Sequence, residues 1–290
     1  MRVTVLIEDQ AAKPGLRTEH GLSLLVEYSG GRILLDAGQG RDTLVENMEA
    51  LGLDPGDLDA LVVSHGHYDH TGGIPALARR KKGLPVYGSP EMFRPSWKLE
   101  PGRPPREVGT PFSREELERA GASFRPVQGL AEVLPGAWAF GPIAGPWTRA
   151  MKGFFLDPEG RNPDPFRHEI LFLLRQDEAG PALLFTGCCH RGVPNTLRAA
   201  AQALQGGRVG ILLGGLHLRS APPGEVEAAA RALEGAGVES LWIGHCTGDS
   251  VVEDFARRPF FQVARLQAGG ALEREGPGRA ESWTGRPAPW

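Results

Sequence analysis

The sequence predicts a mixed α/β protein in which helices cover the faces of β-sheets. Short apolar runs typical of buried strands alternate along the chain with segments of helical periodicity. The order of these elements in the first half of the chain recurs in the second half. Strands that alternate with helices are typical of sheets flanked by helical layers, so we expect a fold of this class.

The expected strands are short and rich in Val, Leu, Ile and aromatic residues. They cover residues 3–7, 22–28, 32–36, 60–64, 85–87, 170–174, 182–186, 209–213, 240–243 and 261–266. The expected helices lie between several of these strands, at residues 42–51, 74–82, 195–204, 225–234 and 250–257.

The internal repeat begins with two strands joined by a tight turn. Residues 24–38 and 171–187 share this pattern, and each is followed by a helix and a buried strand. Histidines follow these buried strands: His65 and His67 in the first half, and His217 in the second. Ligands of open α/β sheets gather beyond the carboxyl ends of the strands, so two similar halves would bring these histidines to one shared edge.

Composition narrows the function classes. The chain has 290 residues, 41% hydrophobic and 23% charged, and a net charge of −3, which disfavours a dedicated nucleic-acid binder. No apolar run approaches the ~18 residues of a membrane helix. The N-terminal apolar stretch is too short for a signal peptide, so we expect a cytoplasmic protein with neither membrane nor nucleic-acid partners.

Three cysteines give no disulfide framework. The preference for Arg over Lys, together with abundant Gly and Pro, suggests a thermophilic source.

We expect a single domain at residues 1–274 with two lid-like insertions. The insertions lie near residues 93–112 and 141–167, contain prolines, basic and aromatic residues, and show no strand or helix pattern. Long segments of this kind are usually functional lids or disordered. Residues 275–290 have no periodicity and are expected to form an irregular tail. The sequence leaves open whether two copies form a homodimer.

Candidate metal ligands are concentrated between a buried strand and a helix. His65, His67, Asp69 and His70 fall within six positions, although the whole chain has only eight histidines. Imidazole and carboxylate groups suit zinc and related first-row metals. His65 and His67 project the same way from an extended segment, and the other two can face a second point. The pattern predicts two neighbouring metal ions, ~3.5–4 Å apart, that share a hydroxide.

Two metal ions need further ligands from elsewhere in the chain. His190 and His245 each lie past the carboxyl end of a predicted strand, as His65 does, and are expected to be ligands. Cys188 occupies a turn, where it is either a thiolate ligand or a small buried residue. Cys189 and Cys246 are expected to be structural.

Other polar residues near strand ends are weaker candidates. His217 is a candidate ligand, proton donor or substrate contact. Glu19 and His20 precede a strand, at the opposite end from the other candidates, and their role is either in the site or structural. His168 precedes another strand, where a structural role is favoured. Asp36 follows a strand and is expected to orient the histidines.

These motifs resemble the signature of a known family. The order His65-x-His67-x-Asp69-His70 after an apolar strand is similar to the signature of the metallo-β-lactamase superfamily. Asp36-x-Gly38, Thr186-Gly187-Cys188 and Gly244-His245 resemble its other motifs, in the same order. The resemblance spans residues 1–270, and it implies a four-layer αββα sandwich with the metals at one edge between the sheets.

A narrower resemblance is to a prokaryotic subgroup named for the synthase of 7,8-dihydropterin-6-methyl-4-(β-D-ribofuranosyl)aminobenzene 5′-phosphate. The matching blocks are residues 19–23, 64–73, 186–192, 214–218 and 245–248. Most superfamily members have an Asp in place of Cys188 and a separate His motif before it. His190 is expected to supply that missing ligand, and the number of metal ions, one or two, stays open.

The resemblance also implies how the ligands are divided. His65, His67 and His190 would hold one ion. Asp69, His70 and His245 would hold the second, with Cys188 near both. Zinc is the expected metal, and manganese or iron are alternatives.

The expected function is that of a metal-dependent hydrolase acting on a small-molecule substrate. A metal-bound hydroxide would attack an ester, phosphoester or lactone of a small, anionic compound, with Asp69 and His217 as catalytic residues. Basic and aromatic residues of the insertions suit a phosphorylated aromatic substrate: Trp97, Arg103, Arg106, Trp147, Arg149 and Lys152.

Two alternatives remain. The subgroup name implies a transferase that joins a dihydropterin-methyl diphosphate to an aminobenzene ribotide. A protein that binds or senses metal without catalysis would also fit the adjacent Cys188, Cys189 and His190.

Overall fold

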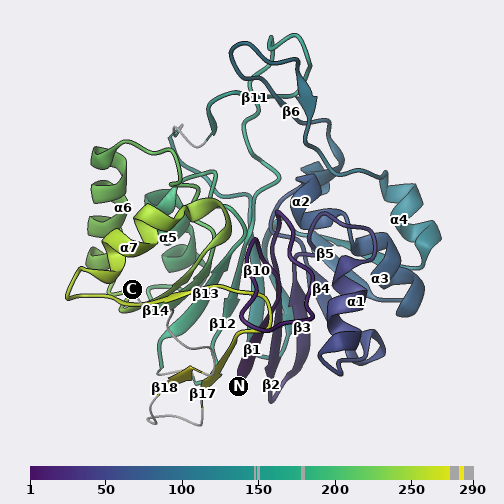
Figure 1. Cartoon of the computed structure of the whole chain (residues 1–290), viewed down its shortest axis with the longest axis horizontal. Coiled ribbons are helices and arrows are strands. Elements are labelled where there is room, and N and C mark those ends of the chain that lie inside the picture. The colour runs from purple at the N-terminus through teal and green to yellow at the C-terminus, as the bar shows by residue number, and fades with distance from the viewer. Residues whose placement is uncertain (147, 149–150, 178–179, 275–280, 284–290) are drawn as a thin grey trace.

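The computed structural model describes residues 1–146, 148, 151–177, 180–274 and 281–283. Within these residues, two large sheets lie face to face, with helices on both outer faces (Figure 1). This arrangement is the expected four-layer αββα sandwich.

The first sheet has eight strands, and most of them come from the first half of the chain. The strands β3, β4, β5 and β8 run parallel, and β17, β1, β2 and β3 alternate in direction. In spatial order the strands are β18 (Glu281–Trp283), β17 (Ala271–Arg274), β1 (Arg2–Ile7), β2 (Ser23–Tyr28), β3 (Gly31–Leu35), β4 (Ala60–Val62), β5 (Pro85–Gly88) and β8 (Ser123–Pro126).

The second sheet has seven strands: β9 and β10 end the first half of the chain, and the other five come from the second half. In spatial order they are β16 (Gln262–Arg265), β15 (Ser240–Ile243), β14 (Val209–Gly214), β13 (Ala182–Thr186), β12 (Leu171–Leu174), β10 (Ala137–Gly141) and β9 (Gly129–Leu134). The first four are parallel, and the last three alternate in direction.

The predicted internal repeat is confirmed by the strand pairing. β2 pairs antiparallel with β3, which is joined through α1 (Thr43–Ala50) to the parallel strand β4. β12 pairs antiparallel with β13, which is joined through α5 (Val193–Ala203) to the parallel strand β14. The two sheets therefore repeat one topology, and the carboxyl ends of β4 and β14 lie in equivalent places.

Apolar side chains fill all three interfaces between the four layers. Side chains alternate between the two faces of a strand, and β13 shows the consequence. Leu183 and Phe185 join the core between the sheets, whereas Leu184 packs beneath the helices. The helices on the second sheet are α5, α6 (Pro223–Gly235) and α7 (Asp249–Ala256). Those on the first are α1, α3 (Ile74–Arg80) and α4 (Arg114–Ala120). Among the helices described, none is long and apolar enough to cross a membrane.

The two insertions differ from the expected irregular loops. They contribute β6 (Trp97–Lys98), β7 (Arg106–Glu107) and β11 (Phe154–Phe155), which pair as a small antiparallel sheet. β6 and β11 project above one edge of the main sheets, near the one-turn helix α2 (Tyr68–Thr71) (Figure 1). We call these three strands the lid sheet. Short strands of this kind pair across long sequence separations, which local pattern does not reveal.

The tail also departs from the expectation. Residues 281–283 form β18, paired antiparallel with β17, instead of irregular structure. Residues 275–280 and 284–290 of the tail lie outside the described part of the chain. Helix α4 was not predicted either, although it carries a recognisable capping box between Ser113 and Glu116.

Candidate metal centre

The candidate site lies where the carboxyl ends of parallel strands from both sheets meet. Asp36 follows β3, and His65 follows β4, in the first sheet. Cys188 follows β13, and His245 follows β15, in the second sheet. Pairing of the two halves thus brings together residues that are up to about 200 positions apart in the sequence, as expected for ligands of an α/β sheet.

A first cluster consists of three buried histidines, His65, His67 and His190. One ring nitrogen from each lies within 4.8 Å of the other two. His65 Nε2 is 3.1 Å from His67 Nδ1. Burial lowers the pKa of His65 well below its ordinary value, and it lowers the pKa of His67 to about 3. His65 and His67 are therefore neutral imidazoles, which is the form that binds metal.

Hydrogen bonds at the far side of the rings turn unprotonated nitrogens toward the cluster. Ser64 Oγ donates its proton to Asp36 Oδ2 at 2.7 Å. His65 Nδ1 lies 3.0 Å from Ser64 Oγ, and because the hydroxyl proton is already used, His65 Nδ1 is the donor in this second hydrogen bond. His70 Nδ1 donates to the same Asp36 oxygen at 2.7 Å. The Nε2 atoms of His65 and His70 are left without a proton, as metal ligands require.

A second cluster surrounds the carboxylate of Asp69. Its Oδ2 lies 3.7 Å from His70 Nε2, 3.5 Å from His245 Nε2 and 3.4 Å from His20 Nε2. Burial raises the pKa of Asp69, but the nearby His70 and His245 outweigh burial and hold it below its usual range. Burial likewise lowers the pKa of His245, but Cys246 and the carboxylates of Asp69 and Asp9 raise it well above its ordinary value. The carboxylates of Asp69 and Asp9 therefore favour a positive charge in this cluster.

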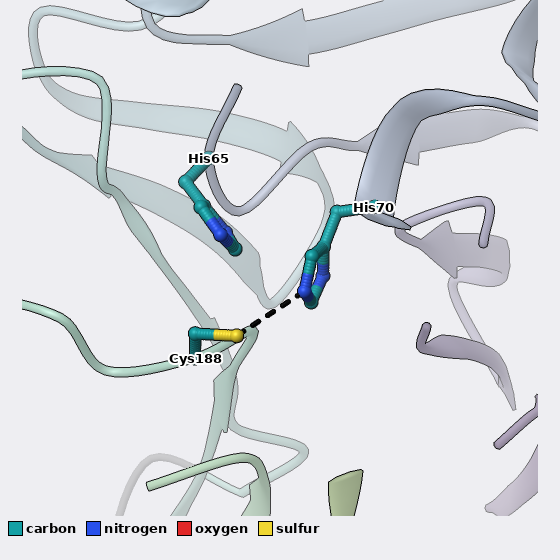
Figure 2. Close-up of side chains that lie close together, drawn as sticks. All are labelled: His65, His70 and Cys188. Carbon is teal, nitrogen blue, oxygen red and sulfur yellow. Dashed lines mark hydrogen bonds between the residues drawn. The ribbon is translucent and has the colours of Figure 1, made fainter. Parts of the chain in front are cut away.

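Cys188 lies between the two clusters. Its Sγ is 3.2 Å from His70 Nε2, and His65 faces the same point from the loop after β4 (Figure 2). Burial raises the pKa of the Cys188 thiol, and a zinc ion beside it would remove the proton. Cys189 turns away, to Thr196 Oγ1 at 3.1 Å in the helix-side core.

Cys246 does not fit the expected structural role. Its Sγ lies within 4.8 Å of Cys188 Sγ and of a ring nitrogen of His245, and it lines the cavity described below. It also accepts the backbone N–H of His217 at 3.3 Å. Cys246 was missed because its side chain is placed by a short 3₁₀ turn, His245–Thr247, that the sequence pattern does not reveal.

The position assigned to His20 was wrong. His20 precedes β2, but β2 runs antiparallel to β3, so its start lies at the same edge as the end of β3. Both ring nitrogens of His20 face carboxylates: Nδ1 is 3.3 Å from Asp9 Oδ1, and Nε2 is 3.4 Å from Asp69 Oδ2. Glu19 has a different place, where its Oε1 accepts the backbone N–H groups of Gln39 and Gly40.

Two buried glutamates that sequence reasoning missed fix the histidine-bearing loops. Glu8 Oε1 accepts the backbone N–H of His245 at 2.6 Å, and Glu169 Oε1 accepts that of His190 at 2.6 Å. Burial raises the pKa of Glu8 to about 7 and also raises the pKa of Glu169. The available signal was an acidic residue next to a buried apolar strand: Glu8 directly follows β1, and Glu169 lies shortly before β12.

His168 supports the first cluster from outside. Its Nδ1 accepts the Gly66 N–H at 2.9 Å, and its Nε2 lies 3.3 Å from Asp164 Oδ2. Ser96 Oγ donates to the same carboxylate at 3.1 Å and lies 3.5 Å from His67 Nε2. Burial raises the pKa of Asp164, but contacts with His168 outweigh it and lower the pKa to about 2. These contacts favour the structural role for His168.

The clusters form the floor of a cavity of about 390 Å³ beneath the lid sheet. Lys98, Arg106 and Lys152 line its upper wall together with Phe154. Lys98 Nζ lies 3.8 Å from the centroid of the Phe154 ring. The Phe154 ring also stacks on His67, with 5.2 Å between the two ring centroids. The wall is therefore basic and partly aromatic.

The remaining lid residues divide between the surface and undescribed positions. Arg103 is exposed, bonds to Glu100 and does not line the cavity. Trp97 lies in β6, opposite Phe155. Trp147 and Arg149 lie outside the described residues.

His217 enters the cavity from the loop after β14. Its ring lies 4.2 Å from that of His190, and within the described structure its buried Nδ1 has no hydrogen-bond partner. Its backbone is left-handed, with φ of 51°, as are those of Asp36 at 57° and His245 at 49°. Such conformations cost about 1–3 kcal/mol each and cluster at functional sites.

The donor set fits a divalent first-row metal. Ring nitrogens of His65, His67 and His190 converge, and the buried His245 Nε2 makes no hydrogen bond within the described residues. Three histidines form one group, and a carboxylate with further histidines forms another, with a thiol between them. Imidazole, carboxylate and thiolate are ligands of zinc and of its neighbours in the series.

Comparisons with known proteins agree with this geometry. A curated relative, 7,8-dihydropterin-6-methyl-4-(beta-D-ribofuranosyl)-aminobenzene-5'-phosphate synthase of Methanocaldococcus jannaschii, is 25% identical and is aligned over 93% of this chain and 95% of its own length. A crystal structure described as a metal-dependent hydrolase of the beta-lactamase superfamily has a TM-score of 0.81 at 28% identity, covering 95% of this chain and all of that one. A diphosphatase of the PhnP family shares the fold, with a TM-score of 0.53 at 15% identity, covering 94% of this chain and 98% of that one.

A family model of the metallo-beta-lactamase superfamily matches residues 16–162, just over half of the 290-residue chain. These residues include the loop of His65, His67, Asp69 and His70. The protein belongs to the metallo-beta-lactamase superfamily.

Proposed function

We propose that this protein is a metal-dependent hydrolase that cleaves a phosphoester or related ester bond in a small, anionic substrate. One observation carries the proposal. The two clusters of metal-ligand side chains share one cavity with three basic side chains of the lid, Lys98, Arg106 and Lys152. Many members of the superfamily are metal-dependent hydrolases, which agrees with this assignment.

The proposed ligands follow the two clusters. His65, His67 and His190 would hold one ion. Asp69, His70 and His245 would hold the other, with Cys188 between them. Zinc suits this mixture of nitrogen, oxygen and sulfur donors. When bound, such ions lower the pKa of water and stabilise negative charge on a substrate oxygen.

The residues around the clusters have separate tasks. Lys98, Arg106 and Lys152 bind the anionic group of the substrate by charge-assisted hydrogen bonds. Phe154 covers His67 and keeps water from that side of the cavity. His217 faces the cavity and donates a proton to the leaving group. The Asp69 carboxylate orients the attacking water.

A substrate screen tests the proposal. Protein loaded with zinc or manganese is offered phosphomonoesters, phosphodiesters, carboxylic esters and lactones, beside the His67→Ala variant. We expect metal-dependent turnover of an anionic phosphoester and at least a hundredfold loss in the variant. Full metal occupancy without turnover of any ester would contradict the hydrolase assignment and favour metal binding or sensing without catalysis.

A transferase is the second candidate, because similarity to the Methanocaldococcus synthase extends over almost the whole of both chains. In that reaction class the basic lid would hold a departing diphosphate while an amine acceptor attacks. Products formed from a pterin-methyl diphosphate, with and without an aminobenzene ribotide, distinguish the two. A joined product favours the transferase, and a free alcohol favours the hydrolase.

A further inference from the structure

We infer that His20 is a further protein ligand of the Asp69 cluster, beside Asp69, His70 and His245. The inference rests on the proposed metal dependence and extends it. It assigns a ligand role to a side chain that the superfamily motifs in this sequence do not include.

The distances around Asp69 indicate a shared centre rather than hydrogen bonds. Charge-assisted N–H···O bonds to a carboxylate are usually ~2.7–2.9 Å long. The Nε2 atoms of His20, His245 and His70 lie farther from Asp69 Oδ2, at 3.4, 3.5 and 3.7 Å. Ligand atoms of a tetrahedral site with bonds of ~2.0–2.2 Å lie ~3.3–3.6 Å apart. The spacing at Asp69 matches that of atoms around one metal ion.

Asp9 gives His20 and His245 the same orientation. Its Oδ1 lies 3.3 Å from His20 Nδ1 and 3.5 Å from His245 Nδ1. The two rings are 4.7 Å apart and tilted by only 31°. A carboxylate on one nitrogen of an imidazole commonly directs the other nitrogen to a metal. Asp9 therefore directs both Nε2 atoms to Asp69.

Asp9 itself is better placed as the orienting carboxylate than as a ligand. Arg219 Nη2 lies 3.2 Å from Asp9 Oδ2 and donates to the carbonyl of His245 at 2.6 Å. The positive charge of the Arg219 guanidinium disfavours a metal ion bound directly to Asp9. It also leaves Asp9 Oδ1 to face the two histidines.

Metal titration with cobalt(II) tests the inference on the full-length protein. The variants are His20→Ala and Asp9→Asn, with Lys152→Ala as a control that changes the cavity wall but removes no candidate ligand. Affinity is measured by chelator competition, and coordination by visible absorption, since the absorption bands of bound cobalt depend on the number and kind of its ligands. Thermal unfolding confirms that each variant is folded.

We expect two ions in the wild type and the control. In His20→Ala, one ion binds at least tenfold more weakly and the visible absorption bands shift, because a water oxygen replaces the imidazole nitrogen. Asp9→Asn gives a smaller change in the same direction. Two ions bound by His20→Ala with wild-type affinity and absorption would overturn the inference and leave the proposed function intact. A single wild-type ion that depends on His67 but not on His20 would do the same. No bound ion in the wild type would overturn both.

Discussion

Asp36 shows how one buried carboxylate fixes several groups of the centre. It is fully buried and accepts hydrogen bonds from the Ser64 backbone, from the Ser64 hydroxyl and from His70. Through Ser64 it also sets which nitrogen of His65 carries the proton. One residue directly after β3 thereby positions ligands of both clusters.

Replacing Asp36 should therefore weaken both stability and metal binding. In Asp36→Ala, three buried donors lose their acceptor, and we expect a loss of about 3–5 kcal/mol in the free energy of unfolding. Metal affinity should fall about 10–100-fold. Urea denaturation and chelator competition measure the two effects. Asp36→Asn keeps one acceptor oxygen and should lose less, and equal values for all three proteins would refute this role.

The adjacent cysteines provide a matched pair. Cys188 Sγ faces His70, whereas Cys189 Sγ faces Thr196 in the core. Cobalt-loaded wild type should show a sulfur-to-metal charge-transfer band in the near ultraviolet. We expect Cys188→Ser to lose this band and Cys189→Ser to keep it. A band that persists in Cys188→Ser and disappears in Cys246→Ser would show that the other buried thiol is the ligand.

At the scale of elements, the direction of each strand decides which residues reach the site. The histidines after β4, β13 and β15 were predicted as site residues. An apolar run followed by polar residues marks the carboxyl end of a buried parallel strand in the sequence, and these histidines come directly after such runs. The place of His20 was readable but missed: two strands joined by a tight turn run antiparallel, so the start of β2 lies at the same edge as the end of β3. The bond between Glu8 and His245 joins residues 237 positions apart, and no local pattern indicates such a pair.

The basic residues of the two insertions that line the cavity should bind the charged part of the substrate. Lys152→Ala removes a cation from the cavity wall, so we expect KM for an anionic phosphoester to rise about tenfold with a smaller change in kcat. Arg103→Ala is the control, because Arg103 is exposed on the same lid and does not line the cavity. The effect should weaken in high salt. Equal KM values for the two variants would contradict a specific anion site.

At the scale of the whole molecule, two similar halves pack through one apolar layer and place their strand ends at one edge. The apolar layer between the sheets could be predicted from the sequence, because strands that are buried on both faces consist of continuous apolar residues. Helix α4, β9 and β10 were not predicted, and several residues of β9 and β10 are half-exposed. The αββα order itself came from the resemblance of the motifs to a known family, because strand patterns alone do not say which strands share a sheet.

The layer between the sheets should carry much of the stability. Phe172 and Phe185 are fully buried there, with ring centroids 5.0 Å apart. Phe185→Ala leaves a cavity, so we expect a loss of about 3–5 kcal/mol in the free energy of unfolding. Leu130→Ala is the control, because Leu130 is 48% exposed, and it should change stability by less than about 0.5 kcal/mol. Chemical denaturation distinguishes the outcomes, and a loss under 1 kcal/mol for Phe185→Ala would contradict this account.

The metal centre is the feature on which the functional account depends. Metal content measured by mass spectrometry, on protein purified without added metal and on the His67→Ala variant, tests it most directly. We predict close to two equivalents of zinc, manganese or iron in the wild type and the loss of at least one in the variant. No metal in either protein, and none taken up on titration, would contradict the account.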